Sequence, residues 1–359
     1  MDRRAFLIAL FAVCGCSPNE APKAGANASN VTPTAAAPSG DKQRSASLES
    51  KTKVPRVAVL VFGTQNTASG VTGTTSVTKL FRDRLTELGY VEGKTILIEE
   101  SYADGDPQRL SQLAHQIVES KPDVIVTIAA SATAAVRQAT STIPIVMAHA
   151  GSPVESGLVA SLAHPRGNVT GTTSMVPELG FKQVEILRQL VPGLARLGVL
   201  ANPTNAGTPP LLANVNEAAR QINVSVVVAE VTRAEDFDKA LAMLRDARPD
   251  ALLVMIEPMI FLNRARVLDF AATNRVPASY DVGREIARQG GLISYGPVLS
   301  THYALVADYV DKILKGAKPG DLPVQQPTQF ALIINLKTAK ALGLKVPQSL
   351  LARADEVLQ

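Results

Sequence analysis

The segment QRLSQLAHQIVESKPDVIVTIAA, residues 108–130, joins an amphipathic stretch to an apolar run through Lys-Pro-Asp. Apolar residues recur at helical spacing before the proline, and the run after it is rich in Val and Ile. Such a continuous run is typical of a strand that is buried on both faces. The segment EDFDKALAMLRDARPDALLVMIE, residues 235–257, repeats the same order of features. This recurrence predicts two similar lobes, each containing strands and helices.

Short apolar runs and helical stripes alternate along the rest of the chain. We expect strands at 56–62, 95–100, 123–130, 144–148, 196–201, 224–230, 250–256 and 291–295. We expect helices at 77–88, 107–119, 131–140, 177–191, 211–222, 235–247, 260–274 and 300–315. This alternation predicts βαβ units, parallel sheets and an α/β fold. Because there are too many units for one compact sheet, we place the break near GNVTGTTS, residues 167–174.

The N-terminus has the layout of an export signal. Arg3 and Arg4 precede the apolar stretch AFLIALFAV (5–13), which is too short to span a bilayer. The two cysteines of the chain, Cys14 and Cys16, follow within FAVCGCSP. VCGC is similar to a bacterial lipobox, so residues 1–16 predict a lipoprotein signal peptide with Cys16 as the lipidated residue. A plain signal peptide without a lipid is the alternative, and the two arginines leave Sec and twin-arginine export both open.

Residues 17–53 are rich in Ala, Ser, Pro, Asn, Thr and Gly, with few large apolar side chains. Such a composition cannot bury enough surface to fold, which predicts a disordered linker. The linker and the anchor would hold the folded part at the outer side of a membrane, as a periplasmic or cell-surface lipoprotein.

Composition and motifs exclude several classes of function. The formal net charge is only +4, and no basic cluster is interleaved with aromatic residues, so nucleic acid is not an expected partner. The chain has no Gly-x-Ser-x-Gly motif, P-loop, GxGxxG motif or ligand-spaced His and Cys residues. We therefore expect a protein that is not an enzyme and that carries no cofactor and no metal.

Several stretches resemble the substrate-binding proteins of ABC transporters, in the group that includes bacterial tryptophan- and tyrosine-binding lipoproteins. The resemblance covers nearly everything from Val54 onward. The stretches are ELGYVEGKTILIEESYADGD (87–106), IVTIAASATAAVRQATSTIPIVMA (125–148), GSPVESGLVASLAHPRGNVTGTTS (151–174), RQGGLISYG (288–296) and DLPVQQPTQFALIINLKTAKALGLKVPQSLLARADEVL (321–358).

The resemblance implies two Rossmann-like lobes of the type I periplasmic binding protein kind, with a ligand in the cleft. It places lobe 1 at 54–172 plus 297–324, and lobe 2 at 173–296 plus 325–359. It also implies a monomer that passes a small polar solute, an amino acid or a related molecule, to an ABC permease and its ATPase. Relatives that bind aromatic amino acids carry Gly-Glu after Asn-Pro, where this chain has Thr204-Asn205, so the resemblance does not fix the ligand.

Candidate ligand-binding residues follow the strands, because ligands of parallel sheets lie beyond the carboxyl ends of the strands. In lobe 1, Ser131 and Thr133 open a helix whose N-terminus could receive a carboxylate, although simple N-capping also explains them. Turn chemistry alone explains Asn202. Asp281 could bind a ligand or could equally cap the helix that follows it. Glu257 could meet a ligand ammonium or hydroxyl group, or it could be a solvated loop charge. The full set is Thr64, Gln65, Asn66, Ser131, Thr133, His149, Ser152, Asn202, Thr204, Asn205, Glu257, Tyr280, Asp281 and Tyr295.

Two functions fit these expectations. The first is a solute receptor of an ABC importer. The second is a ligand-binding sensor that presents its bound form to a membrane signalling partner.

Overall fold

Five parallel strands form the first of two sheets in the computed structural model, which describes residues 53–65, 77–174, 179–205, 207–281 and 284–359. Their order is β2-β1-β3-β4-β5, and every neighbouring pair is parallel. The strands are β1 (Arg56–Val61), β2 (Leu97–Tyr102), β3 (Val124–Ile128), β4 (Ile145–Ala150) and β5 (Val169–Thr173).

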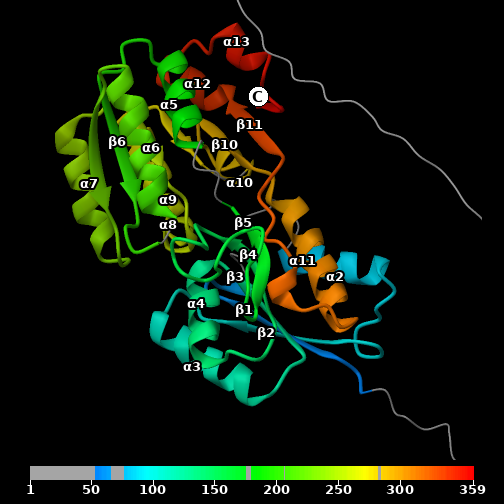
Figure 1. Cartoon of the computed structure of the whole chain (residues 1–359). Helices are drawn as coiled ribbons and strands as arrows, with labels where there is room; N and C mark the ends of the chain where they lie inside the picture. Colours follow the sequence, from blue (N-terminus) through cyan, green and yellow to red (C-terminus); the bar gives the residue numbers. More distant parts are fainter. Residues whose placement is uncertain (1–52, 66–76, 175–178, 206, 282–283) are drawn as a thin grey trace, which may run out of the picture. The chain divides into compact units, whose positions relative to one another are not determined.

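The second sheet has seven strands in the order β12-β11-β10-β9-β8-β6-β7. They are β6 (Arg196–Ala201), β7 (Ser225–Glu230), β8 (Ala251–Val254), β9 (Ala278–Tyr280), β10 (Ile293–Pro297), β11 (Phe330–Asn335) and β12 (Glu356–Leu358). Only the β10–β11 pair is antiparallel within the described sheet. The series β7-β6-β8-β9-β10 repeats the order β2-β1-β3-β4-β5, so the prediction of two Rossmann-like lobes with parallel sheets is confirmed (Figure 1).

The two Pro-Asp segments lie at equivalent places in the two lobes. In the first, Asp123 Oδ2 accepts a hydrogen bond of 2.8 Å from the backbone N–H of Arg56, where the neighbouring strand β1 begins. In the second, Asp250 Oδ2 accepts bonds of 2.8 Å from Ala195 and Arg196 at the start of β6. Each aspartate therefore satisfies backbone donors at the amino edge of its sheet, which gives the repeated motif a structural reason.

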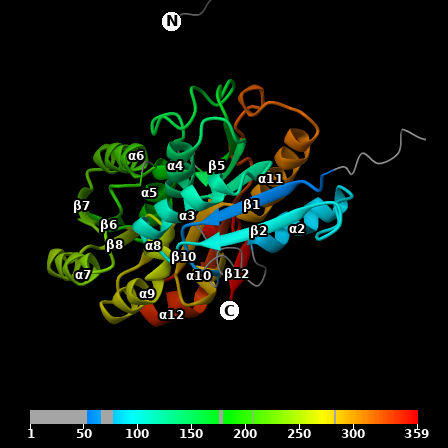
Figure 2. The same ribbon diagram turned by 90° about the horizontal axis from the view of Figure 1, so that it is seen from below.

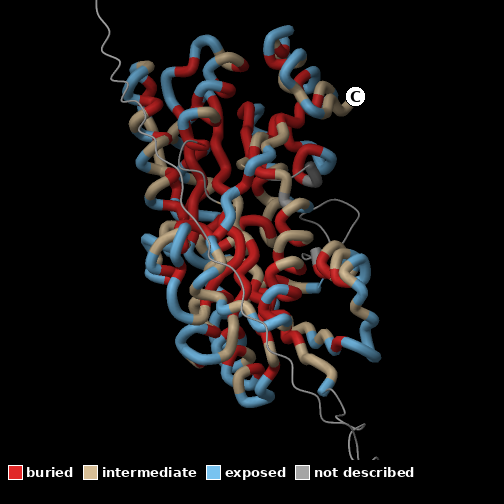
Figure 3. Tube along the Cα trace, turned by 45° about the vertical axis from the view of Figure 1, so that its right-hand side comes forward, coloured by how far each residue is buried: buried red, intermediate tan, exposed pale blue. Residues whose placement is uncertain are grey.

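Helices cover both faces of each sheet. In β1, Val57, Val59 and Val61 pack in one hydrophobic cluster, whereas Ala58 and Leu60 pack in another. This alternation explains why the strand is a continuous apolar run instead of a mixed one. Figure 3 shows this burial along the trace, with buried segments in the interior and exposed ones mainly at the outer turns. In the five-stranded lobe the helices are α2 (Val77–Glu87), α3 (Pro107–Glu119), α4 (Ala130–Ala139) and α11 (Leu299–Leu314).

The other helices lie around the seven-stranded sheet: α5 (Leu179–Leu190), α6 (Thr208–Gln221), α7 (Asp236–Ala247), α8 (Pro258–Leu262), α9 (Arg264–Thr273), α10 (Arg284–Arg288), α12 (Leu336–Leu342) and α13 (Gln348–Leu351). The helix expected at 260–274 is two helices, because Asn263 ends α8 and begins α9.

Successive described elements change lobe at three points: from β5 to α5, from β10 to α11 and before β11. After β10, α11 returns to the five-stranded sheet, where it packs on β4 and lies beside α2 (Figures 1 and 2). The short helix η1 (Pro319–Asp321) follows, and Gln325 then pairs with the β5 edge. Thr173 N donates to Gln325 O at 2.9 Å, and Gln325 N donates to Gly171 O at 3.0 Å. Residues 53–359 form one compact unit that contains both sheets.

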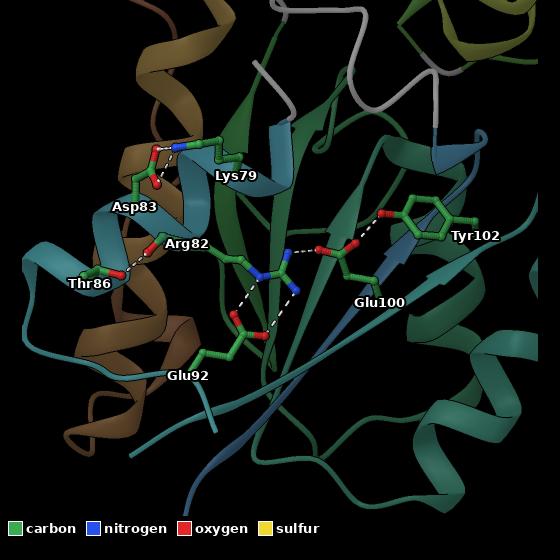
Figure 4. Close-up of polar contacts among 7 residues, drawn as sticks. All are labelled: Lys79, Arg82, Asp83, Thr86, Glu92, Glu100 and Tyr102. Carbon is green, nitrogen blue, oxygen red and sulfur yellow. Dashed lines mark hydrogen bonds and ion pairs between the residues drawn. The ribbon is translucent and has the colours of Figure 1, made fainter. Parts of the chain in front are cut away.

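An ion network fixes α2 against the edge strand β2 (Figure 4). Arg82 on α2 donates through Nε to Glu92 at 2.9 Å and through Nη1 to Glu100 on β2. The hydroxyl of Tyr102 also donates to Glu100, whose side chain is only 14% exposed. The network therefore holds a carboxylate that is mostly withdrawn from solvent.

None of the described helices is long and apolar enough to cross a membrane. The predicted signal peptide, the linker up to residue 52, Cys16 and Asn66 lie outside the described residues.

Candidate functional site

A cavity of about 180 Å³ lies at the carboxyl ends of strands from both sheets. Residues after β1, β3 and β4 line it from the five-stranded lobe, and residues after β6, β8 and β9 line it from the seven-stranded lobe. Ligands of parallel α/β sheets bind at these strand ends. A cavity of about 150 Å³ is large enough for benzene, so this one has room for a small organic molecule.

The larger part of the cavity wall is apolar. Five of the larger apolar and aromatic side chains on it are Phe62, Leu179, Leu211, Phe261 and Tyr303. Phe62 follows β1, Phe261 belongs to α8, and Tyr303 comes from α11. An apolar wall with a few polar groups is the usual composition of a small-molecule site.

Two carboxyl groups of the seven-stranded lobe lie on the cavity wall. Glu257 follows β8 and caps α8, with Oε1 accepting from Ile260 N at 2.8 Å. Asp281 follows β9, and its Oδ1 accepts from Ile256 N at 2.7 Å. Burial raises the pKa of Glu257, while burial together with the nearby Glu257 charge raises the pKa of Asp281 to about 7. A cationic ligand group between them would favour their charged forms.

The N-terminus of α4 opens on the same cavity. Ala129 and Ala130 line it, and no side-chain hydrogen bond caps this end of α4 in the described structure. Ala129 has φ 80° and ψ 158°, a region that residues other than glycine rarely adopt and that often marks a functional site. The first N–H groups of a helix and its dipole favour an anion.

A stacked pair of histidines lies on the side of the five-stranded lobe. His149 lines the cavity and has φ 56°, within an irregularity of the β4–β5 pairing. Its ring stacks on His302 of α11 at a centroid distance of 4.8 Å and meets the edge of Tyr303 at 4.8 Å. Burial lowers the pKa of His149 well below its usual value and lowers the pKa of His302 to about 4. Both rings are therefore neutral at neutral pH.

Four of the residues predicted from the sequence line this cavity: His149, Asn205, Glu257 and Asp281. The other described members of the predicted set do not line it: Thr64, Gln65, Ser131, Thr133, Ser152, Asn202, Thr204, Tyr280 and Tyr295.

Local contacts explain where several of these other residues lie. The hydroxyl of Thr133 is buried, 2.8 Å from Thr127 Oγ1 and 3.0 Å from Ala129 O. Asn202 is buried and accepts from the backbone N–H of Thr204 at 3.0 Å, which is an Asx turn. Tyr280 belongs to the hydrophobic core of its lobe.

Two further predicted residues have clear surroundings. Tyr295 stacks on Phe330 at a centroid distance of 6.1 Å. Ser152 is buried, and its carbonyl accepts from Ser156. Ser131 is exposed at the first turn of α4.

The apolar residues of the wall were not among those predicted, because they look like core residues in the sequence. Position alone could have indicated Phe62, since it ends the first apolar run. Tyr303 has no such signal, because it reaches the cavity only through the return of α11 to the five-stranded sheet.

Comparisons with known proteins show which family the chain is similar to. The family described as ABC transporter substrate binding protein matches residues 70–358. The chain is 28% identical over 273 residues to a tyrosine-binding protein of Clostridioides difficile, covering 74% of this chain and 76% of that protein.

Two solved structures are also similar. A conserved domain protein of Vibrio cholerae has a TM-score of 0.79 and 28% identity, with 85% of this chain and 100% of that chain covered. An ABC domain in complex with L-Trp from Streptococcus pneumonia has a TM-score of 0.78 and 25% identity, with 85% and 99% covered.

Proposed function

Because the chain belongs to the ABC transporter substrate-binding protein family, we propose that it binds an amino acid or a related small amine and delivers it to a permease. Proteins of this family are extracytoplasmic solute binders and not enzymes. The observation that carries the proposal is the meeting of two carboxyl groups and an uncapped helix N-terminus on one mostly apolar cavity.

Each part of an amino acid has a suitable partner on the cavity wall. The ammonium group would lie against Glu257 and Asp281, where it would favour their charged forms. The carboxylate would accept from N–H groups at the start of α4. An apolar side chain would fill the remaining wall, beside Phe62 and Phe261. The names of the similar proteins, which bind tyrosine and L-Trp, support this class of ligand.

We also propose that the folded part is held at a membrane surface through a lipid on Cys16 and the linker of residues 17–53. The support for this is the sequence: a basic start, a short apolar stretch and a lipobox-like VCGC.

The test is a thermal-shift screen of residues 53–359 against amino acids, small amines, sugars and carboxylic acids. The whole of the solved Vibrio cholerae chain aligns with 85% of this chain, so a domain about as long as residues 53–359 folds on its own. A solute present at 100 times its Kd should stabilise the domain by about 2.7 kcal/mol, or about 4 °C. The proposal fails if no amine in the panel shifts the melting temperature.

A matched pair of variants locates the binding site. Glu257→Gln keeps the oxygen that caps α8 but removes the charge, so the Kd for the amine found in the screen should rise roughly 10- to 100-fold. Glu119→Gln makes the same change at the end of α3, which precedes β3 and so lies at the opposite edge of the sheet. Equal affinity in both variants would mean that the ligand does not bind in this cavity.

A further inference from the structure

Two glycines from different lobes meet at the cavity. Gly151 directly follows β4, and Gly207 is the N-cap residue of α6. Both line the cavity. A Cβ atom added to Gly151 would lie 3.1 Å from Gly207 Cα, 3.3 Å from Gly207 N and 3.3 Å from Asn205 Oδ1. The lobes therefore touch here backbone to backbone, with no room for a methyl group at ordinary van der Waals distance.

Backbone conformation does not explain why these positions are glycine. Gly151 does not have a positive φ, and Gly207 has φ −77° and ψ −20°, which any residue can adopt. At Gly151, the close backbone of Gly207 is what disfavours a side chain, because a Cβ would fit only if the neighbour shifted. By contrast, Gly105 has φ 80°, so its backbone conformation already favours glycine.

The loop of Gly105 makes a second contact between the lobes. A Cβ atom on Gly105, between β2 and α3, would lie 3.0 Å from Leu262 Cδ1 at the end of α8. Here the partner is the end of a flexible side chain, which can move away. The Gly151–Gly207 contact cannot adjust in that way, because both partners are backbone.

We infer that the contact between Gly151 and Gly207 is the stop that sets how far the two lobes close over the cavity. Two-lobed binding proteins close around their ligands by hinge motion. A side chain at Gly151 would stop that motion earlier and would leave the bound solute partly solvated. Gly151 and Gly207 are then positioning residues whose effect on affinity comes through lobe closure. The effect of the stop on affinity rests on the proposed function, whereas the stop itself does not.

The first arm of the test needs no ligand. Residues 53–359 contain no cysteine, so Gly151→Cys with Gly207→Cys can be oxidised and examined for an internal disulfide by non-reducing electrophoresis and mass. The positive control is Arg166→Cys with Gly320→Cys, since a Cβ on Gly320 lies 3.1 Å from Arg166 Cα within one lobe. We expect both pairs to form disulfides. A disulfide in the control alone would overturn the inference.

The second arm measures affinity by titration calorimetry with L-tyrosine and L-tryptophan as probes. Gly151→Leu should weaken binding roughly tenfold or more, by overpacking at the contact. Gly193→Leu is the matched control, because nothing lies within 4 Å of a Cβ there and its φ is not positive. Equal affinity in the two variants would refute the link between the stop and affinity. If the wild-type protein binds neither probe, the amino-acid proposal fails for them, and the disulfide arm still decides whether the stop exists.

Discussion

Replacing Asp281 with asparagine should stabilise the ligand-free domain at neutral pH and leave its stability nearly unchanged in acid. The pKa of Asp281 is raised to about 7 in the folded protein, mainly by burial, compared with about 3.9 in an unfolded chain. Between these values the folded state binds more protons than the unfolded state, so the wild-type protein loses stability as the pH rises from about 4 to 7. Asparagine keeps an oxygen that can accept from Ile256 N but does not ionise.

The full difference of about 3 pKa units corresponds to about 4 kcal/mol in the free energy of unfolding. Because Asp281 keeps some contact with solvent, we expect about 2–4 kcal/mol at pH 8, or about 3–6 °C in melting temperature. Thermal melts from pH 4 to pH 8 measure this, with the exposed Asp321→Asn variant as control. A constant difference between Asp281→Asn and the wild type across this range would refute the argument.

Three further outcomes follow from the structure. His302→Phe keeps a ring against His149 but removes a group whose pKa is about 4 in the folded protein, below its unfolded value. The variant should therefore lose less melting temperature than the wild type between pH 6.5 and pH 4, and an unchanged acid profile would contradict this. Arg82→Met should lower the free energy of unfolding, measured by urea denaturation, by about 1–2 kcal/mol, because it leaves the mostly buried Glu100 without its cation (Figure 4). The exposed Lys79→Met should lower it by under about 0.5 kcal/mol, and equal costs in the two variants would mean that the network does not stabilise the fold. Cys16→Ser should move the full chain from the membrane fraction to the soluble fraction of cells, and retention at the membrane would refute lipidation at Cys16.

Much of the fold could be predicted from short-range patterns. The apolar runs of central strands such as β1 and β3 are buried on both faces, whereas the edge strands β2 and β7 are only partly buried. The two Pro-Asp segments are equivalent because each aspartate binds the start of a neighbouring strand. The short strands β9 and β12 gave weaker signals, since three residues are too few for a pattern. The return of α11 to the five-stranded sheet is a long-range contact that no local pattern contains.

The candidate site could be predicted only in part. The rule that ligands lie beyond strand ends pointed to the loops that hold Glu257 and Asp281. It could not separate them from neighbours such as Tyr280, which is one residue earlier and faces the core. Apolar wall residues such as Phe261 have the same sequence character as core residues, and their role depends on how the two lobes meet.

We propose above that a small amine-bearing solute binds in the cavity at Glu257 and Asp281. Native mass spectrometry of residues 53–359, incubated with an equimolar mixture of the twenty amino acids, tests it most directly. We expect one dominant adduct at one molecule per protein, lost in the Glu257→Gln, Asp281→Asn double variant and retained in Glu119→Gln. The absence of any adduct, or an adduct that survives in the double variant, would contradict it.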